Sequence, residues 1–259
     1  MLGLTQGITE FLPISSTAHL RIVPALAGWP DAGAAYTAVL QLGSLVAVLG
    51  FFARDLVAMA GAALDPARRR GPEARMLLAI VLGTIPIGLA GVLLKHAVEG
   101  PLRKLPVIGA SLVLVGLLMA VVERRARHER GFEQIGLRDA LLVGLAQTLA
   151  LVPGVSRSGI TLCCAMALGL RRDAAARFSF LLSVPAVAAA GVFELPKVLR
   201  APGLVGAPLA VGLVLAAVSG YLSIAWLLRF LRTRTTIPFV VYRVAVGVAL
   251  LAAVAAGAL

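Results

Sequence analysis

Long apolar runs, each about as long as a helix that crosses a bilayer, constrain this chain more than any other feature. Five of them hold few or no charges: 33–52, 76–94, 105–122, 204–228 and 244–259. A helix needs about 20 mostly apolar residues to cross the hydrocarbon core. Lipid offers backbone groups no partner, so they must bond within the segment. The sequence therefore predicts an all-α integral membrane protein.

Composition supports a membrane protein and argues against a nucleic-acid-binding one. The chain is 60% hydrophobic and 14% charged, whereas soluble domains are about 25% charged. Its 27 glycines suit close helix packing in lipid. Nearly all the Lys and Arg behind the net charge of +12 lie between apolar runs, and no aromatic-plus-basic module is present. We expect no nucleic acid as partner, and anionic lipid headgroups as the partners of these charges.

The hydropathy pattern predicts six transmembrane helices and two interrupted regions. The interrupted regions, 2–28 and 138–170, are apolar but contain Pro, Ser and Arg, so each is predicted to be a re-entrant helix pair. The N-terminus lacks a basic region, so no cleaved signal peptide is expected. The six spans are predicted at 33–53, 73–95, 105–122, 178–194, 205–228 and 236–258.

Positive charge is distributed unequally between the two sets of connecting loops. Loops 95–104 and 195–203 together hold five Lys and Arg. The other set holds sixteen, in loops 54–75, 123–138, 171–177 and 229–234. Because loops rich in Lys and Arg stay in the cytoplasm, the set with sixteen is predicted to be cytoplasmic. The pair at 2–28 then opens outward and the pair at 138–170 opens inward.

The two interrupted regions resemble each other, which predicts an internal repeat. One reads QGITEFLPISSTAHL from Gln6 and the other QTLALVPGVSRSGITL from Gln147. We predict a single membrane domain, 1–259, with pseudo-repeats of inverted topology at about 1–122 and 138–259, joined by the basic cytoplasmic loop 123–137. Inverted repeats with broken helices place a ligand near the midplane, where the breaks meet. The alternative is two ordinary helices that are merely kinked.

The first interrupted region concentrates reactive groups. Pro13 should end a helix that carries Glu10, and Ser15 is a plausible N-cap of the next helix. Ser16 and His19, three residues apart, then share a face. Ionisable residues at membrane depth are candidates for a functional site. The alternatives are a Glu10 that reaches water at a helix end and a His19 with a structural role.

The second interrupted region suits an anion. Gly154 permits a tight turn, and Ser156 or Ser158 can cap the helix that follows. A helix start offers free N–H groups to an anion, and Arg157 adds a planar fork that matches phosphate oxygens. The alternative for Arg157 is a structural salt bridge, with Glu10 as the expected partner.

Together the two regions predict phosphate chemistry on a membrane-embedded substrate. Glu10, with Gln6 as a second ligand, is the candidate site for a divalent ion that substrate phosphate and water complete. Gln41, Ser44, Ser179 and Ser183 are expected to support the site. Arg243 is expected to snorkel to the cytoplasmic surface. Cys163 and Cys164 are adjacent, so they are expected to be buried core residues and not a disulfide.

At these residues the chain resembles the undecaprenyl-diphosphate phosphatase family, also called bacitracin-resistance proteins. The family's (E/Q)-x-x-x-E and F-L-P-(I/V)-S-S-(S/T)-x-H segments match Gln6 to His19, and P-G-x-S-R-S-G-x-T matches Pro153 to Thr161. Departures are few: Gln6 stands at the first acid position, Ala18 where glycine is common, and Thr37 where an acid is frequent. Further matches are Leu40–Ser44, Phe178–Leu182 with Pro185, and Ile237–Phe239 with Tyr242 and Arg243.

The resemblance implies hydrolysis of undecaprenyl diphosphate, which recycles the lipid carrier for cell-wall glycans, in the bacterial plasma membrane. It implies a divalent metal, usually Mg²⁺ or Ca²⁺, and a site open to the extracytoplasmic side. Glu10 would be the essential acid, Ser16 the candidate nucleophile, His19 a proton-transfer group and Arg157 the phosphate clamp. The expected phosphate-binding residues are Ser15, Thr17, Ser156, Ser158, Gly159 and Thr161.

Two alternatives stay open. Within the enzyme class, water attacks directly after activation by Glu10 or His19, in place of Ser16. From another class, a transporter or flippase of polyprenyl phosphates would share the inverted repeat and the broken helices. The sequence does not determine the oligomeric state and leaves a homo-oligomer open.

Overall fold

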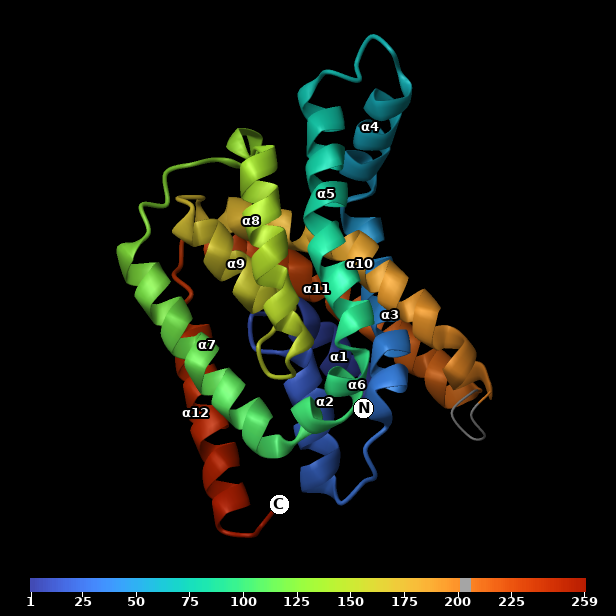
Figure 1. Ribbon diagram of the computed structural model, residues 1–259, viewed down its shortest axis with the longest axis vertical. Coiled ribbons are helices and arrows are strands. Elements are labelled where there is room, and N and C mark those ends of the chain that lie inside the picture. Colours follow the sequence, from blue (N-terminus) through green and yellow to red (C-terminus); the bar gives the residue numbers. More distant parts are fainter. Residues whose placement is uncertain (201–205) are drawn as a thin grey trace.

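The structure, a computed structural model, describes residues 1–200 and 206–259, and helices dominate the described chain (Figure 1). Among these residues the only β contact is an isolated bridge between Arg130 and Leu170. The elements in chain order are α1 (Leu2–Phe11), α2 (Ser16–Ala27), α3 (Gly33–Phe51), α4 (Ala53–Leu64), α5 (Pro72–Leu93), α6 (Lys95–Glu99), η1 (Pro101–Arg103), α7 (Leu105–Arg125), η2 (Phe132–Gln134), α8 (Leu137–Gln147), η3 (Thr148–Leu151), α9 (Arg157–Ala167), α10 (Arg172–Arg200), α11 (Ala207–Leu231) and α12 (Ile237–Ala255).

Six helices in the described chain are long and apolar enough to cross a bilayer: α3, α5, α7, α10, α11 and α12. They overlap the six predicted spans, which confirms the all-helical membrane class. Helix α10 extends beyond both ends of the predicted span 178–194. Residue 205 of the predicted span 205–228, and residues 201–203 of the predicted loop 195–203, lie outside the described residues.

The segment 54–75 is only partly a loop, so the prediction of a loop throughout is wrong. Its first part is α4, which runs antiparallel beside α5 in a hairpin that projects from the body of the protein (Figure 1). Met59 and Ala62 are buried on α4, and Met59 belongs to the same core cluster as Met76 of α5. This small apolar face explains why the segment folds as a helix.

Both interrupted regions contain two short helices separated by a proline turn, and in the second region η3 continues α8 up to that turn. Leu12 and Val152 have extended backbones, with φ/ψ of −66°/139° and −79°/117°. Each precedes a proline, whose ring disfavours helical backbone at the residue before it. The chain therefore leaves the helix at the same place in both regions and begins α2 or α9 after the turn.

Close glycine contacts hold the first helix of each region inside the bundle. A Cβ atom at Gly3 of α1 would lie 2.2 Å from the carbonyl oxygen of Gly212 in α11, and one at Gly144 of α8 would lie 2.0 Å from that of Gly83 in α5. Only glycine permits such approach of two helix backbones. Figure 1 shows α1 and α2 between the α7–α12 pair and the α3–α10 pair, whose members contact each other.

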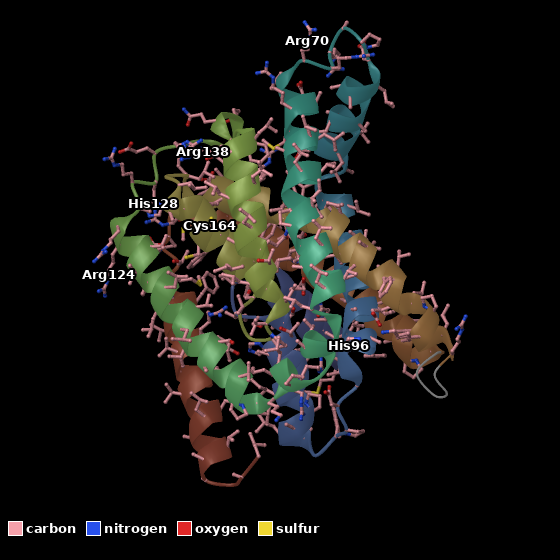
Figure 2. All side chains as sticks on the ribbon, in the orientation of Figure 1. Arg70, His96, Arg124, His128, Arg138 and Cys164 are labelled. Carbon is pink, nitrogen blue, oxygen red and sulfur yellow. The ribbon has the colours of Figure 1, made fainter. Side chains whose placement is uncertain are left out.

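The connections with the most Lys and Arg lie apart from the connection 95–104, which holds three. Figure 2 shows Arg70 at the tip of the α4–α5 hairpin and Arg124 and Arg138 near the α7–α8 connection, whereas His96 lies toward the other end. Glu123, at the end of α7, accepts hydrogen bonds from Arg172 Nε at 2.7 Å and from Thr236 Oγ1 at 2.7 Å. This carboxylate thereby joins the ends of α7, α10 and α12.

Candidate active site

The two serine turns have the same backbone geometry. Ser15 has φ/ψ of 77°/97° and Ser156 has 73°/117°. Each serine caps the helix that follows it, with Oγ accepting from Ala18 N at 3.3 Å and from Gly159 N at 3.1 Å. A residue other than glycine at positive φ costs about 1–3 kcal/mol, which the surrounding contacts must offset. The sequence predicted Ser15 as a cap and offered Ser156 or Ser158 as the other, of which Ser156 is the cap, but it did not predict this backbone.

The turns are in direct contact. Ser158 Oγ lies 3.1 Å from the carbonyl oxygens of both Glu10 and Leu12, to which its hydroxyl donates. The N–H of Gly154 donates to Thr17 Oγ1 at 3.5 Å. Residues 137 to 148 positions apart in the sequence thus form one site, as the repeat led us to expect.

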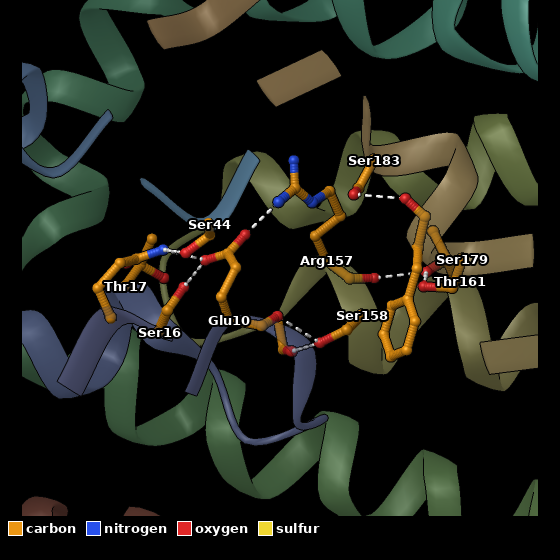
Figure 3. Close-up of polar contacts among 12 residues, drawn as sticks. Glu10, Ser16, Thr17, Ser44, Arg157, Ser158, Thr161, Ser179 and Ser183 are labelled. Carbon is orange, nitrogen blue, oxygen red and sulfur yellow. Dashed lines mark hydrogen bonds and ion pairs between the residues drawn. The ribbon is translucent and has the colours of Figure 1, made fainter. Parts of the chain in front are cut away.

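Glu10 lies at the centre of this site and is 7% exposed. One carboxylate oxygen forms an ion pair with the Arg157 guanidinium, and the other accepts from Ser16 Oγ at 2.5 Å (Figure 3). That second oxygen also accepts from Gln6 Nε2 at 2.8 Å. The carboxylate therefore links the candidate nucleophile of the first region to the guanidinium of the second.

The ion pair between Arg157 and Glu10 is the partnership that the sequence offered as the alternative to a phosphate clamp. Both side chains are largely buried, and an unpaired charge in such surroundings is costly. Each of the two therefore needs a partner of opposite charge. A phosphate group is also negatively charged and would fit the same fork.

His19 is held by groups other than Ser16. Its Nδ1 lies 2.7 Å from the carbonyl oxygen of Ser15, and its Nε2 lies 2.7 Å from Tyr242 Oη. A carbonyl only accepts, so for a neutral ring Nδ1 carries the hydrogen and Nε2 accepts from the Tyr242 hydroxyl. Among the described residues no hydrogen bond joins His19 to Ser16, whose hydroxyl is directed to Glu10 instead.

Arg243 does not snorkel to the surface, so that prediction is wrong. It is 0% exposed and donates to the carbonyl oxygens of Pro13, Gly154 and Val155 at 3.0, 2.9 and 2.9 Å. The nearby non-helical carbonyls need donors in an apolar interior, and they draw the guanidinium inward.

Of the residues expected to support the site, Ser179 and Ser44 form hydrogen bonds with site residues and Gln41 does not. Thr161 Oγ1 donates to the Arg157 carbonyl at 2.7 Å and accepts from Ser179 Oγ at 2.6 Å, so Ser179 supports the second turn. Ser44 lies 3.2 Å from Gln6 Nε2. Gln41 is partly buried and forms no side-chain hydrogen bond with any residue that the structure describes. A small pocket beside these groups is lined by Glu10, Phe11, Arg157, Ser158, Ser179, Phe180 and Ser183.

The Glu10 carboxylate is a candidate ligand for a hard cation, although the described residues contain no group of three His, Cys, Asp or Glu side chains that could hold a metal. Gln6 Oε1 is buried and lacks a hydrogen-bond partner, and it belongs to the side chain that contacts Glu10. Mg²⁺ is commonly held by one or two carboxylates with substrate phosphate and water as further ligands. Glu10 and Gln6 fit that pattern.

Tyr242 and Arg243 were matched to the family motifs, but reasoning from their residue types did not place them in the site. The signal that could have found Arg243 is the one applied to Arg157: an arginine inside an apolar run needs a partner. Tyr242 carries no such signal, because a tyrosine near the start of a transmembrane helix is ordinary.

Comparison with known proteins gives a consistent result over the whole chain. Residues 1–249 match the model of the family described as bacitracin resistance protein BacA. An undecaprenyl-diphosphatase from Myxococcus xanthus is 53% identical over 100% of this chain and 89% of its own length. Proteins of the same name from Nocardioides sp. and Synechococcus elongatus are 50% and 48% identical, over 99% and 100% of this chain and 96% and 93% of their own lengths. The chain therefore belongs to the bacitracin resistance protein BacA family.

Proposed function

We propose that this chain is a membrane phosphatase that hydrolyses undecaprenyl diphosphate to undecaprenyl phosphate and inorganic phosphate. The relatives carry the name of that activity. The observation that carries the proposal is the position of Glu10, which contacts Ser16 and Arg157 at once (Figure 3). The reaction would recycle the lipid carrier for peptidoglycan synthesis and confer resistance to bacitracin.

In the proposed reaction the terminal phosphate binds between the two turns. Arg157 and the N–H groups at the start of α9 neutralise phosphate oxygens, which is the larger part of catalysis in phosphoryl transfer. Ser16 Oγ attacks the terminal phosphorus and gives its proton to Glu10, its hydrogen-bond partner at 2.5 Å. The bond to the bridging oxygen breaks, undecaprenyl phosphate leaves, and water then releases phosphate from Ser16.

In this scheme His19 is not the base that takes the proton of Ser16. Instead, His19 and Tyr242, which are joined by a hydrogen bond, exchange a proton with the departing lipid phosphate or with the incoming water. A divalent ion held by Glu10 and Gln6 would supply further positive charge at the phosphate oxygens.

The test measures phosphate release from a polyprenyl diphosphate by the purified protein in detergent, with and without EDTA. We expect release that EDTA abolishes and that added Mg²⁺ or Ca²⁺ restores. Absence of release with every metal would defeat the enzyme and leave the transporter. Trapping of a phosphorylated Ser16 would support attack by the serine. If the Ser16→Ala variant instead kept most of the wild-type turnover, water would be the nucleophile.

We also propose that the α1–α2 and α8–α9 pairs are re-entrant and related as inverted repeats, with the site open to the extracytoplasmic side of the inner membrane. Two observations support this proposal. The turns have matching backbone geometry, and the first helix of each pair packs on a long helix of the other half, α1 on α11 and α8 on α5. A cysteine-free background allows single cysteines at Arg69 and Lys104 to be labelled by an impermeant maleimide. In spheroplasts we expect labelling at Lys104 only, and the reverse pattern would contradict the orientation.

A further inference from the structure

Arg243 belongs to α12, outside both motif regions, yet it contacts the two turns at once. One terminal nitrogen donates to the carbonyl oxygen of Pro13, in the first turn. The other donates to the carbonyl oxygens of Gly154 and Val155, in the second turn. No other side chain in the described structure bonds to backbone carbonyls of both turns.

The three carbonyls belong to backbone that has left its helix. They lie just before Ser15 and Ser156, the two serines at positive φ. Backbone of this kind persists in an apolar interior only when its polar groups are bonded and its conformation is held by its surroundings. Arg243 supplies both requirements with one planar group.

The charge of Arg243 has no carboxylate partner among the described residues, since Glu10 pairs with Arg157. Its Nε is also buried without a hydrogen-bond partner. A buried guanidinium with three neutral acceptors is costly compared with an apolar side chain of similar size. The arrangement is therefore poorly explained by stability alone and is better explained by a need to fix the turns.

We propose that Arg243 is a positioning residue that sets the distance between the helix start carrying Ser16 and the helix start carrying Arg157. With both starts fixed, Glu10, Ser16 and Arg157 meet on one phosphate group. This inference rests on the proposed phosphatase function and adds to it a residue that never touches the substrate.

The first test replaces Arg243 by lysine, which keeps the charge but lacks the fork that reaches both turns. Displacement of reacting groups by about 1 Å costs about 10²-fold in rate, so we expect kcat to fall by about that factor while KM changes by less than about threefold. A folded Arg243→Lys protein with kcat close to that of the wild type would overturn the proposal.

Arg130 offers a matched control. Its guanidinium also donates to two backbone carbonyls, those of Gln134 and Leu168, and it pairs with Asp139 away from the turns. Arg130→Lys is expected to lower the melting temperature without changing kcat. The two proposals are tested separately. Failure of the wild-type protein to release phosphate would count against the phosphatase function, whereas the variants test the role of Arg243.

A second pair of variants decides the matter if Arg243→Lys is not recovered folded. A Cβ atom at Gly116 would lie 3.0 Å from a Val244 methyl and 3.4 Å from Arg243 Cβ, so Gly116→Ala presses on α12 at Arg243 and requires a shift of a few tenths of an ångström. Gly109→Ala strains the same α7–α12 contact against Leu251, at 2.8 Å. We expect Gly116→Ala to lower kcat about threefold more than Gly109→Ala, because a shift of a few tenths of an ångström costs less than the displacement of about 1 Å considered above. Equal values of kcat would overturn the proposal.

Discussion

At the scale of single residues, Glu10 controls what its neighbours can do. Its carboxylate accepts from Arg157, Ser16 and Gln6, so all of its strong contacts are with other site residues. A substitution at any one of them also changes the other two. Kinetic effects of the four residues should therefore be non-additive, as in other groups that act as a unit.

Arg157→Lys keeps the charge but removes the planar fork. We expect kcat to fall by about 10²-fold, the usual cost of losing a donor that stabilises developing charge. The measurement is phosphate release at saturating substrate, with the melting temperature as the check on folding. A rate equal to that of the wild type would return Arg157 to the purely structural salt bridge.

Tyr242→Phe removes the hydroxyl that donates to His19 Nε2 but leaves the stacked ring, whose centroid lies 5.6 Å from that of the imidazole. One neutral hydrogen bond is worth about 0.5–1.5 kcal/mol, so we expect kcat to fall about 2–10-fold. The companion variant His19→Ala should lose much more. If Tyr242→Phe and His19→Ala were equally impaired, Tyr242 would be as important as the imidazole itself.

At the scale of helices and turns, the two proline breaks follow from local sequence. Proline predicts the extended residue before it, and the serine that follows predicts the cap. The positive φ of Ser15 and Ser156 could not be predicted in this way, because contacts from α12, distant in the sequence, stabilise it. Local rules thus located both turns but did not give their conformation.

The backbone of the turn can be tested at Ser156. Ser156→Ala loses the cap and keeps the backbone strain that the wild-type serine already carries, so we expect the free energy of unfolding to fall by about 0.5–2 kcal/mol. Ser156→Gly also loses the cap but tolerates positive φ, so its loss should be a few tenths of a kcal/mol. The measurement is unfolding by SDS titration in mixed micelles.

Ser183, inside α10, is the control for this pair. At a helical position glycine is less favourable than alanine by about 1 kcal/mol, so the order of the two variants should reverse. The same order at both positions would argue against strain at Ser156.

At the scale of the whole molecule, the six spans could be predicted from hydropathy because lipid requires long apolar helices. The helix α4 could not, because its small apolar face is satisfied only when it packs on α5. The buried position of Arg243 could not either, because it depends on contacts with turns that are distant in the sequence. The candidate site was predicted as a meeting of two motifs. Which atoms meet, such as Ser16 with Glu10 in preference to His19, depends on the turn geometry.

The end of the molecule that carries the basic connections contains its own buried polar contacts. Asp139 accepts from both terminal nitrogens of Arg130, at 2.9 and 2.6 Å, and from Gly136 N at 2.9 Å. Burial alone raises the pKa of Asp139, but the hydrogen bonds from Arg130 and Gly136 outweigh it, so the pKa lies below the ordinary value of 3.8. The unfolded chain thus binds the proton more readily than the folded one.

The contribution of Asp139 to stability is accordingly complete above the ordinary value and is lost as the pH falls through the lowered pKa. At pH 7 we expect Asp139→Asn to lower the free energy of unfolding by about 1–2 kcal/mol, since Arg130 is 34% exposed and the pair is partly screened. The difference from the wild type should be constant from pH 7 to 5 and should shrink below about pH 4. A difference that grows on acidification would contradict this sign.

The ion pair between Glu10 and Arg157 also affects how the site is cleared after each turnover. In the proposed reaction an arriving diphosphate displaces the carboxylate of Glu10 from the guanidinium, and Glu10 returns to it when hydrolysis is complete. The protein thus contains a tethered competitor for its own product. Free phosphate should consequently be a weak inhibitor, and Glu10→Gln, whatever its turnover, should bind phosphate more tightly than the wild type.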